Sequence, residues 1–159
     1  MKEFFVPNTV TSFSNENPFV LIAGPCQVES KEHAMEMCGS LLEISMLYNI
    51  PLVYKSSFDK ANRTSFNSPR GLGLEKSLQV FEEIQNQFKV PVITDVHESG
   101  QCKEVASVVN MLQIPAFLCR QTDLLMASAE TQKPVMIKKG QFMAPWDMKN
   151  VIEKISHIN

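Results

Sequence analysis

The sequence lacks a long apolar run: no stretch approaches the roughly 18 residues that a membrane-spanning helix needs. Its first residues also lack the apolar core and the small-residue cleavage site of a signal peptide, so we expect a cytoplasmic protein that does not contact a membrane. Basic residues are not in excess, because 15 Lys and Arg stand against 17 Asp and Glu. Nucleic-acid binding is therefore not expected.

Cysteines are few and show no CxxC pairing, and in a reducing compartment they are expected to be thiols rather than a disulfide frame. The four are Cys26, Cys38, Cys102 and Cys119. Three of them we assign to packing. Cys26 follows Gly24-Pro25 at the end of an apolar run, and its residue type there leaves two interpretations open: a metal-binding or catalytic thiol, or a small buried apolar side chain.

Short apolar runs alternate with segments of helical period, which predicts βαβ units and a parallel sheet. The five expected strands are 19–25, 52–57, 90–96, 111–115 and 135–138. The five expected helices are 31–48, 74–88, 100–109, 123–130 and 146–157. Ser30, Ser99 and Thr122 are expected as helix caps, with Pro145 in a first turn. Segment 8–17 is expected to connect two short strands that close the bottom of the sheet.

Polar and charged residues collect where the expected strands end, at the edge where α/β sheets carry their sites. Five of them are cations, which together predict a rim that binds phosphate and carboxylate groups: Lys55, Lys60, Arg63, Arg120 and Lys138. A single lysine after a strand is usually a solvated loop residue, and only the number of cations favours a site. Asp95 lies two residues before His97, on the same side of an extended strand, which favours a functional histidine.

Several motifs resemble the 3-deoxy-D-manno-octulosonate 8-phosphate synthase family. They are Ala23-Gly24-Pro25-Cys26, Lys55-Ser56-Ser57-Phe58-Asp59-Lys60-Ala61-Asn62-Arg63-Thr64-Ser65, Thr94-Asp95-Val96-His97-Glu98, Gln113-Ile114-Pro115-Ala116-Phe117-Leu118 and Arg120-Gln121-Thr122-Asp123-Leu124. The resemblance implies an α/β fold, a parallel (β/α)₈ barrel of TIM type. It also implies an aldol-type transferase of lipopolysaccharide (KDO) biosynthesis that condenses phosphoenolpyruvate with D-arabinose 5-phosphate and water, releasing phosphate.

The resemblance also implies a role for each residue that matches a motif. Lys60 and Lys138 would hold phosphoenolpyruvate, with Lys55, Gln113 and Ala116 supporting the pocket. The residues that would grip arabinose 5-phosphate are Asn62, Arg63 and Thr64. Asp95 and His97 would lie at the reacting end of the sugar, and with Lys60 and Lys138 they form the expected catalytic set. Arg120 resembles a residue that reaches a phosphate in a neighbouring subunit of the family's homotetramer.

Cys26 resembles the metal-binding cysteine of the metal-dependent class of this family. Its thiolate would bind a divalent ion such as Zn²⁺, Fe²⁺ or Mn²⁺. The family's remaining ligands, a histidine, a glutamate and an aspartate, would come from later strands that this chain does not contain.

The chain contains only about five of the eight βα units of a closed barrel, which takes about 250 residues. We therefore treat 1–159 as a partial barrel domain, with 1–17 as its bottom-closing segment, and expect no synthase activity from these residues alone. They could be a fragment of a longer enzyme, a poorly folding product, or an inactive half-barrel that needs a complementary chain. A third interpretation is a 3-deoxy-heptulosonate 7-phosphate synthase. It is disfavoured because Asn62 stands where that family tends to carry proline.

Overall fold

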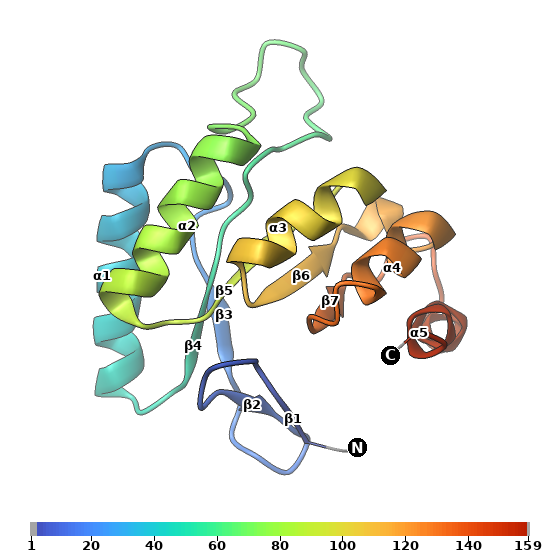
Figure 1. The fold of residues 1–159 in the computed structure, drawn as a ribbon, viewed down its shortest axis with the longest axis horizontal. Helices are drawn as coiled ribbons and strands as arrows, with labels where there is room; N and C mark the ends of the chain where they lie inside the picture. The colour runs from blue at the N-terminus through green and yellow to red at the C-terminus, as the bar shows by residue number, and fades with distance from the viewer. Residues whose placement is uncertain (1–2, 159) are drawn as a thin grey trace. The chain divides into compact units, whose positions relative to one another are not determined.

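The computed structural model describes residues 3–158 (Figure 1). Met1, Lys2 and Asn159 belong to the expected domain 1–159 but lie outside the described residues. The chain divides into two compact units, Met1–Thr94 and Asp95–Asn159.

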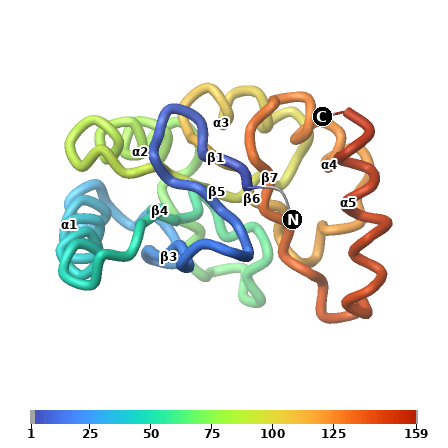
Figure 2. Tube along the Cα trace, turned by 90° about the horizontal axis from the view of Figure 1, so that it is seen from below, coloured from blue at the N-terminus to red at the C-terminus, as the bar shows by residue number. Residues whose placement is uncertain are grey.

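The first unit begins with a small hairpin, whose blue trace runs on into the first strand of the main sheet (Figure 2). Strand β1 (Phe4–Phe5) pairs antiparallel with β2 (Ser12–Phe13), and the rings of Phe4 and Phe13 stack with centroids 5.1 Å apart. Segment 8–17 was expected only to connect two strands, but β2 lies inside it. Phe4 and Phe13 lie opposite each other in the register, and their stack stabilises this pairing. That the hairpin closes the bottom of a barrel stays a prediction.

Three parallel strands and two helices make up the rest of the first unit. Strand β3 (Leu21–Ala23) pairs with β4 (Leu52–Lys55), which pairs with β5 (Val92–Asp95), whose last residue begins the second unit. Helices α1 (Lys31–Leu47) and α2 (Leu74–Phe88) pack against each other (Figure 1). The Ser30 hydroxyl accepts a hydrogen bond from the His33 amide, which confirms the predicted cap. Tyr54, Phe81 and Ile84 are fully buried in this core.

The second unit contains two parallel strands, β6 (Met111–Ile114) and β7 (Val135–Ile137). Its α-helices are α3 (Cys102–Val108), α4 (Thr122–Ala129) and α5 (Met148–Ser156), and its short 3₁₀ turns are η1 (Ser99–Gln101), η2 (Ala116–Leu118) and η3 (Pro145–Asp147). Helix α4 packs against both α3 and α5. The buried side chains of Leu112, Ile114 and Leu125 belong to its core.

Two expected caps of the second unit are wrong. Ser99 lies inside η1, because Glu98 and Gln101 form a reciprocal capping box that starts the turn one residue earlier. Thr122 is the first residue of α4 rather than its cap, and its hydroxyl accepts a hydrogen bond from Lys154 Nζ at 2.7 Å. Pro145 opens η3, as a residue without an amide hydrogen can, so that α5 starts at Met148 and not at residue 146.

In the first unit the strands follow the order β3-β4-β5, and in the second unit β6 lies beside β7; the pairs β3–β4, β4–β5 and β6–β7 are parallel. Consecutive neighbours joined through helices are the βα units of a TIM-type barrel. The predicted fold class, a partial parallel α/β barrel of five units, is confirmed. Within residues 3–158, no helix is both long and apolar enough to cross a membrane.

Candidate functional site

The chain that leaves β3 is held tightly against the end of β4. A Cβ atom on Gly24 would lie 2.0 Å from the Lys55 carbonyl oxygen, so only glycine fits there. The buried Ser56 hydroxyl donates to the Pro25 carbonyl at 3.0 Å, and Gln27 forms a parallel bridge with Ser57. These contacts fix the short segment that carries Cys26.

Two predicted lysines converge on one buried hydroxyl at the end of β4. Lys55 Nζ and Lys60 Nζ donate to Ser57 Oγ at 3.1 and 2.7 Å, and Ser57 is fully buried. Like charges so close to one oxygen repel each other in a partly buried place, and an anion between them relieves that repulsion. The end of β4 is therefore suited to a carboxylate or phosphate group.

The loop that follows β4 carries the residues predicted to bind the sugar; in Figure 1 it extends, in green, beyond β4 and α2. Arg63 is held on both edges, because its Nη2 donates to Gln27 Oε1 at 2.8 Å and its Nε to the Pro69 carbonyl at 3.1 Å. Asn62 and Thr64 lie exposed on either side of it. The loop thus presents a fixed guanidinium flanked by an amide and a hydroxyl.

In the second unit, the predicted pair Asp95 and His97 is formed. His97 Nε2 lies 3.0 Å from Asp95 Oδ2, and the two side chains are 12% and 7% exposed. The Gln101 side chain accepts a hydrogen bond from the His97 amide at 2.9 Å, which fixes the backbone of the histidine. An imidazole held by a buried carboxylate can take up or release a proton next to a bound substrate.

The ends of β6 and β7 position three further predicted residues. Gln113 is buried in β6, and its carbonyl accepts a hydrogen bond from the Val96 amide at 3.0 Å. Lys138 follows β7 with an exposed side chain, and its amide donates to the Ile114 carbonyl at 3.1 Å. Ala116 begins η2, where its carbonyl oxygen would lie only 3.0 Å from a Cβ atom on Gly140.

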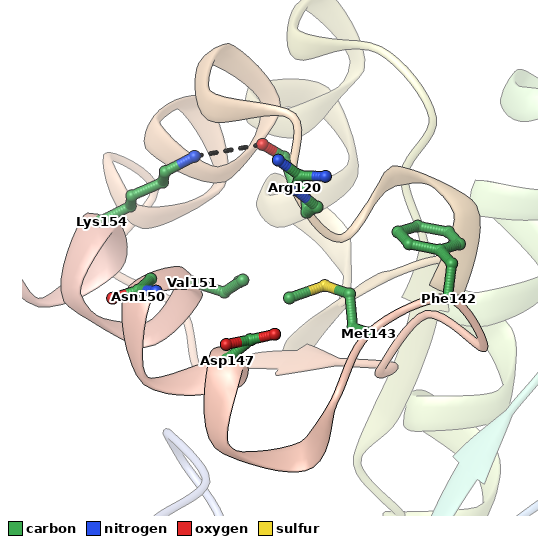
Figure 3. A pocket seen from close by; sticks show the side chains of 7 residues that line it. All are labelled: Arg120, Phe142, Met143, Asp147, Asn150, Val151 and Lys154. Carbon is green, nitrogen blue, oxygen red and sulfur yellow. Dashed lines mark hydrogen bonds between the residues drawn. The ribbon is translucent and has the colours of Figure 1, made fainter.

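Arg120, the last predicted cation, lines a cavity of about 320 Å³ in the second unit (Figure 3). Its side chain is exposed, and its carbonyl accepts a hydrogen bond from Lys154 Nζ at 3.2 Å. The other lining residues are Phe142, Met143, Asp147, Asn150, Val151 and Lys154. One carboxylate faces this cavity together with the two cationic side chains, so the cavity has mixed charge.

The three cysteines assigned to packing are buried as predicted, and the exposure of Cys26 contradicts its interpretation as a small buried apolar side chain. Cys38, Cys102 and Cys119 are buried and Cys26 is exposed. Burial raises the pKa of the Cys38 thiol to about 12 and also raises the pKa of Cys102, so both stay protonated at neutral pH. Residues 3–158 contain no group of three His, Cys, Asp or Glu side chains that could hold a metal ion. Cys26 is thus a single soft donor, and the described residues do not make up a metal site by themselves.

Sequence reasoning missed several residues that hold the predicted ones in place: Gln27, Ser56, Ser57, Asp59 and Arg70. Ser57 could have been found, because it lies two residues after Lys55 and therefore on the same face of an extended strand. The hydrogen bond between Gln27 and Arg63 joins residues 36 positions apart, and no local pattern signals it.

Comparison with known proteins supplies a family. The DAHP synthetase I family model matches residues 7–158. The chain is similar to proteins named 2-dehydro-3-deoxyphosphooctonate aldolase: 61% identical over 145 residues to that of Brucella anthropi, covering 91% of this chain and 52% of the relative. The Bartonella quintana protein is 57% identical over 157 residues (96% and 56%), and the Bradyrhizobium diazoefficiens protein 60% over 147 residues (92% and 52%). The chain spans about half the length of these relatives.

Proposed function

Because the chain belongs to the DAHP synthetase I family, we propose that it carries substrate-binding residues for the condensation of phosphoenolpyruvate with D-arabinose 5-phosphate. The names of its relatives confirm the resemblance to octulosonate 8-phosphate synthases that the motifs indicate. The observation that carries the proposal is the convergence of Lys55 and Lys60 on Ser57, which makes an anion site at the end of a barrel strand.

The reaction joins two anions, and fixed cations are needed to hold them within bonding distance. Lys60 and Lys55 bind the phosphoenolpyruvate carboxylate or phosphate at the end of β4, and Lys138, by resemblance, binds the same substrate. Gln113 and Ala116 support that pocket. Lysine suits this task because its ammonium group is a compact point charge that can follow the substrate.

The acceptor sugar is assigned to the loop after β4. The Arg63 guanidinium, held by Gln27 and Pro69, offers its remaining N–H groups to the sugar phosphate. Asn62 and Thr64 add an amide and a hydroxyl for the oxygens of the sugar. Because Asn62 has an amide where the heptulosonate enzymes tend to carry proline, we propose arabinose 5-phosphate rather than erythrose 4-phosphate as the acceptor.

In the chemical step, C3 of phosphoenolpyruvate forms a bond to the aldehyde carbon of the sugar, and water adds at C2. The added water loses both of its protons as its oxygen becomes the C2 carbonyl oxygen. One proton goes to the aldehyde oxygen, and the other goes to the phosphate that leaves when the C2–O bond to phosphate breaks. We assign the handling of these protons to His97, because its Nε2 is held 3.0 Å from Asp95 Oδ2 in a mostly buried place.

For a divalent metal, we propose Cys26 as one of the ligands. An exposed thiol after β3 is a suitable soft donor for Zn²⁺, Fe²⁺ or Mn²⁺. Catalytic zinc sites generally take about three protein ligands. Within residues 3–158, Cys26 is the one ligand proposed.

Assembly and location complete the proposal. Arg120 is exposed and lines an open cavity, which is compatible with a role toward a neighbouring subunit of a homotetramer. The substrates are sugar phosphates and phosphoenolpyruvate, for which a cytoplasmic enzyme is proposed.

The test is a chimera in which residues 7–158 replace the matching segment of the Bradyrhizobium diazoefficiens relative, so that the rest of a full-length protein is present. Phosphate release is measured with phosphoenolpyruvate, a divalent metal and either arabinose 5-phosphate or erythrose 4-phosphate. Turnover that requires arabinose 5-phosphate supports the proposal. Preference for erythrose 4-phosphate favours a heptulosonate synthase, and no turnover with either sugar favours an inactive half-barrel.

A further inference from the structure

A loop held at its base by an ion pair carries the acceptor-binding residues. Two backbone hydrogen bonds join the segment that enters this loop to the segment that leaves it. The Gly73 amide donates to the Phe58 carbonyl at 3.1 Å, and the Lys60 amide donates to the Arg70 carbonyl at 2.7 Å. Gly71 takes a φ of +112° in the segment that leaves the loop, where a Cβ atom would lie 2.7 Å from the Phe58 carbonyl oxygen. Residues 61–69 therefore form a loop with a narrow base.

Asp59 and Arg70 face each other across this base. Arg70 Nε donates to Asp59 Oδ1 at 2.8 Å, and Arg70 Nη2 donates to Asp59 Oδ2, so the pair is bidentate. The Asp59 side chain is 20% exposed and that of Arg70 61%. Two parallel N–H···O bonds fix the relative orientation of the groups as well as their distance. The hydrogen bonds from Arg70 to Asp59 also raise the pKa of the arginine.

The two ends of the ion pair lead directly to the substrate-binding residues. Asp59 precedes Lys60, whose ammonium group bonds to Ser57. Arg70 follows Pro69, whose carbonyl accepts the hydrogen bond from Arg63 Nε. A shift of the Arg70 side of the base therefore moves one of the two contacts that aim the Arg63 guanidinium. Lys60 depends less on the pair, because its side chain is anchored to the buried Ser57.

We propose that the Asp59–Arg70 ion pair is a positioning element for the acceptor sugar, which holds loop 61–69 so that Arg63 meets the sugar phosphate. This inference rests on the proposed function of that loop. Arg70 acts through Pro69 and Arg63 and is a positioning residue rather than a catalytic one. The contrasting interpretation is an ordinary surface ion pair, which contributes little beyond stability.

The kinetic test uses Arg70→Ala in the chimera. We expect the KM for arabinose 5-phosphate to rise about ten-fold and the KM for phosphoenolpyruvate to change by less than about three-fold. Arg70→Lys keeps the charge without the fork and should recover only part of the loss. The exchanged pair, Asp59→Arg with Arg70→Asp, should recover more than either single change.

The matched control is Lys31→Ala. Lys31 Nζ forms an ion pair with Glu83 Oε2 at 2.6 Å between α1 and α2 of the same unit, where the two side chains are 51% and 45% exposed. Lys31→Ala should leave both KM values unchanged. If Arg70→Ala lowers only the melting temperature, as Lys31→Ala would, the positioning role is refuted while the proposed function stands.

Amide hydrogen exchange on the full chain tests the role of the ion pair without an activity measurement. Arg70→Ala should accelerate exchange in 61–69 and leave α2 unchanged, whereas unaltered exchange in the loop would overturn the inference. A wild-type chimera that does not turn over arabinose 5-phosphate would refute the proposed function, and with it the role of the loop toward the sugar, even if the exchange result holds.

Discussion

Gly24→Ala perturbs a close approach of two backbone segments in the first unit, the end of β3 and the end of β4. The added Cβ would lie 2.0 Å from the Lys55 carbonyl oxygen, and the nearest separation that real Cβ atoms show is 3.0 Å. The end of β3 and the end of β4 must therefore move apart by at least the difference of 1.0 Å. A flexible side chain could turn away from such a contact, but a backbone carbonyl within a sheet cannot.

The expected loss of folding stability follows from the packing and the hydrogen bond that this movement disturbs. Overpacking of a well-packed region costs about 1–3 kcal/mol. The Ser56 hydroxyl is fully buried, and separating it from the Pro25 carbonyl breaks a buried hydrogen bond, at a further cost of about 1 kcal/mol. We expect Gly24→Ala to lower the free energy of unfolding by about 3 kcal/mol. With a urea m-value of about 2 kcal/mol/M, the midpoint falls by about 1.5 M.

The assay is urea unfolding of the chain followed by circular dichroism, with Gly100→Ala as the matched control. Gly100 lies in η1, and a Cβ atom there would meet nothing within 4 Å. This control should change the stability by less than about 0.5 kcal/mol. If Gly24→Ala were as harmless as Gly100→Ala, the close packing of β3 against β4 would be wrong, and so would the account of how Cys26 is positioned.

Three further predictions concern the site. In calorimetry on the chimera, Lys60→Ala should weaken phosphoenolpyruvate binding by about ten-fold or more, about 1.4 kcal/mol, while the exposed Lys76→Ala on α2 should not; equal affinities would reject the lysine assignment. The chimera should show a higher kcat/KM for arabinose 5-phosphate than for erythrose 4-phosphate because of Asn62, and equal values would contradict that reason. At pH 8, iodoacetamide should label the exposed Cys26 in peptide maps and spare Cys38, whose pKa of about 12 keeps it protonated.

Local sequence pattern determined the secondary structure well wherever one physical signal dominated. Helix α2 has the predicted bounds, Leu74–Phe88, because its apolar residues recur with helical period and Gly73 precedes it. Strands β4, β5 and β6 lie within the predicted apolar runs, because strands covered on both faces need continuous apolar sequence. The pattern failed at helix starts, for example by predicting Ser99 as a cap. Which of several neighbouring polar side chains accepts the hydrogen bonds of the free amides is not visible in the local pattern.

The residue types of the site were also readable from the sequence, because cations and an acid–histidine pair at strand ends are visible as letters. The contact between Asp95 and His97 follows from a spacing of two in an extended chain. The motifs indicated a family that the comparisons confirm.

Only the tertiary structure decided which of these groups share a partner. Lys55 and Lys60 are five positions apart and meet at Ser57 because the chain turns after β4, and Arg63 meets Gln27 because β3 and β4 are neighbours. The Asp59–Arg70 pair depends in the same way on the closure of a loop. Periodicity reports the burial of one element at a time, whereas such contacts depend on how the chain returns on itself, which packing between distant residues sets.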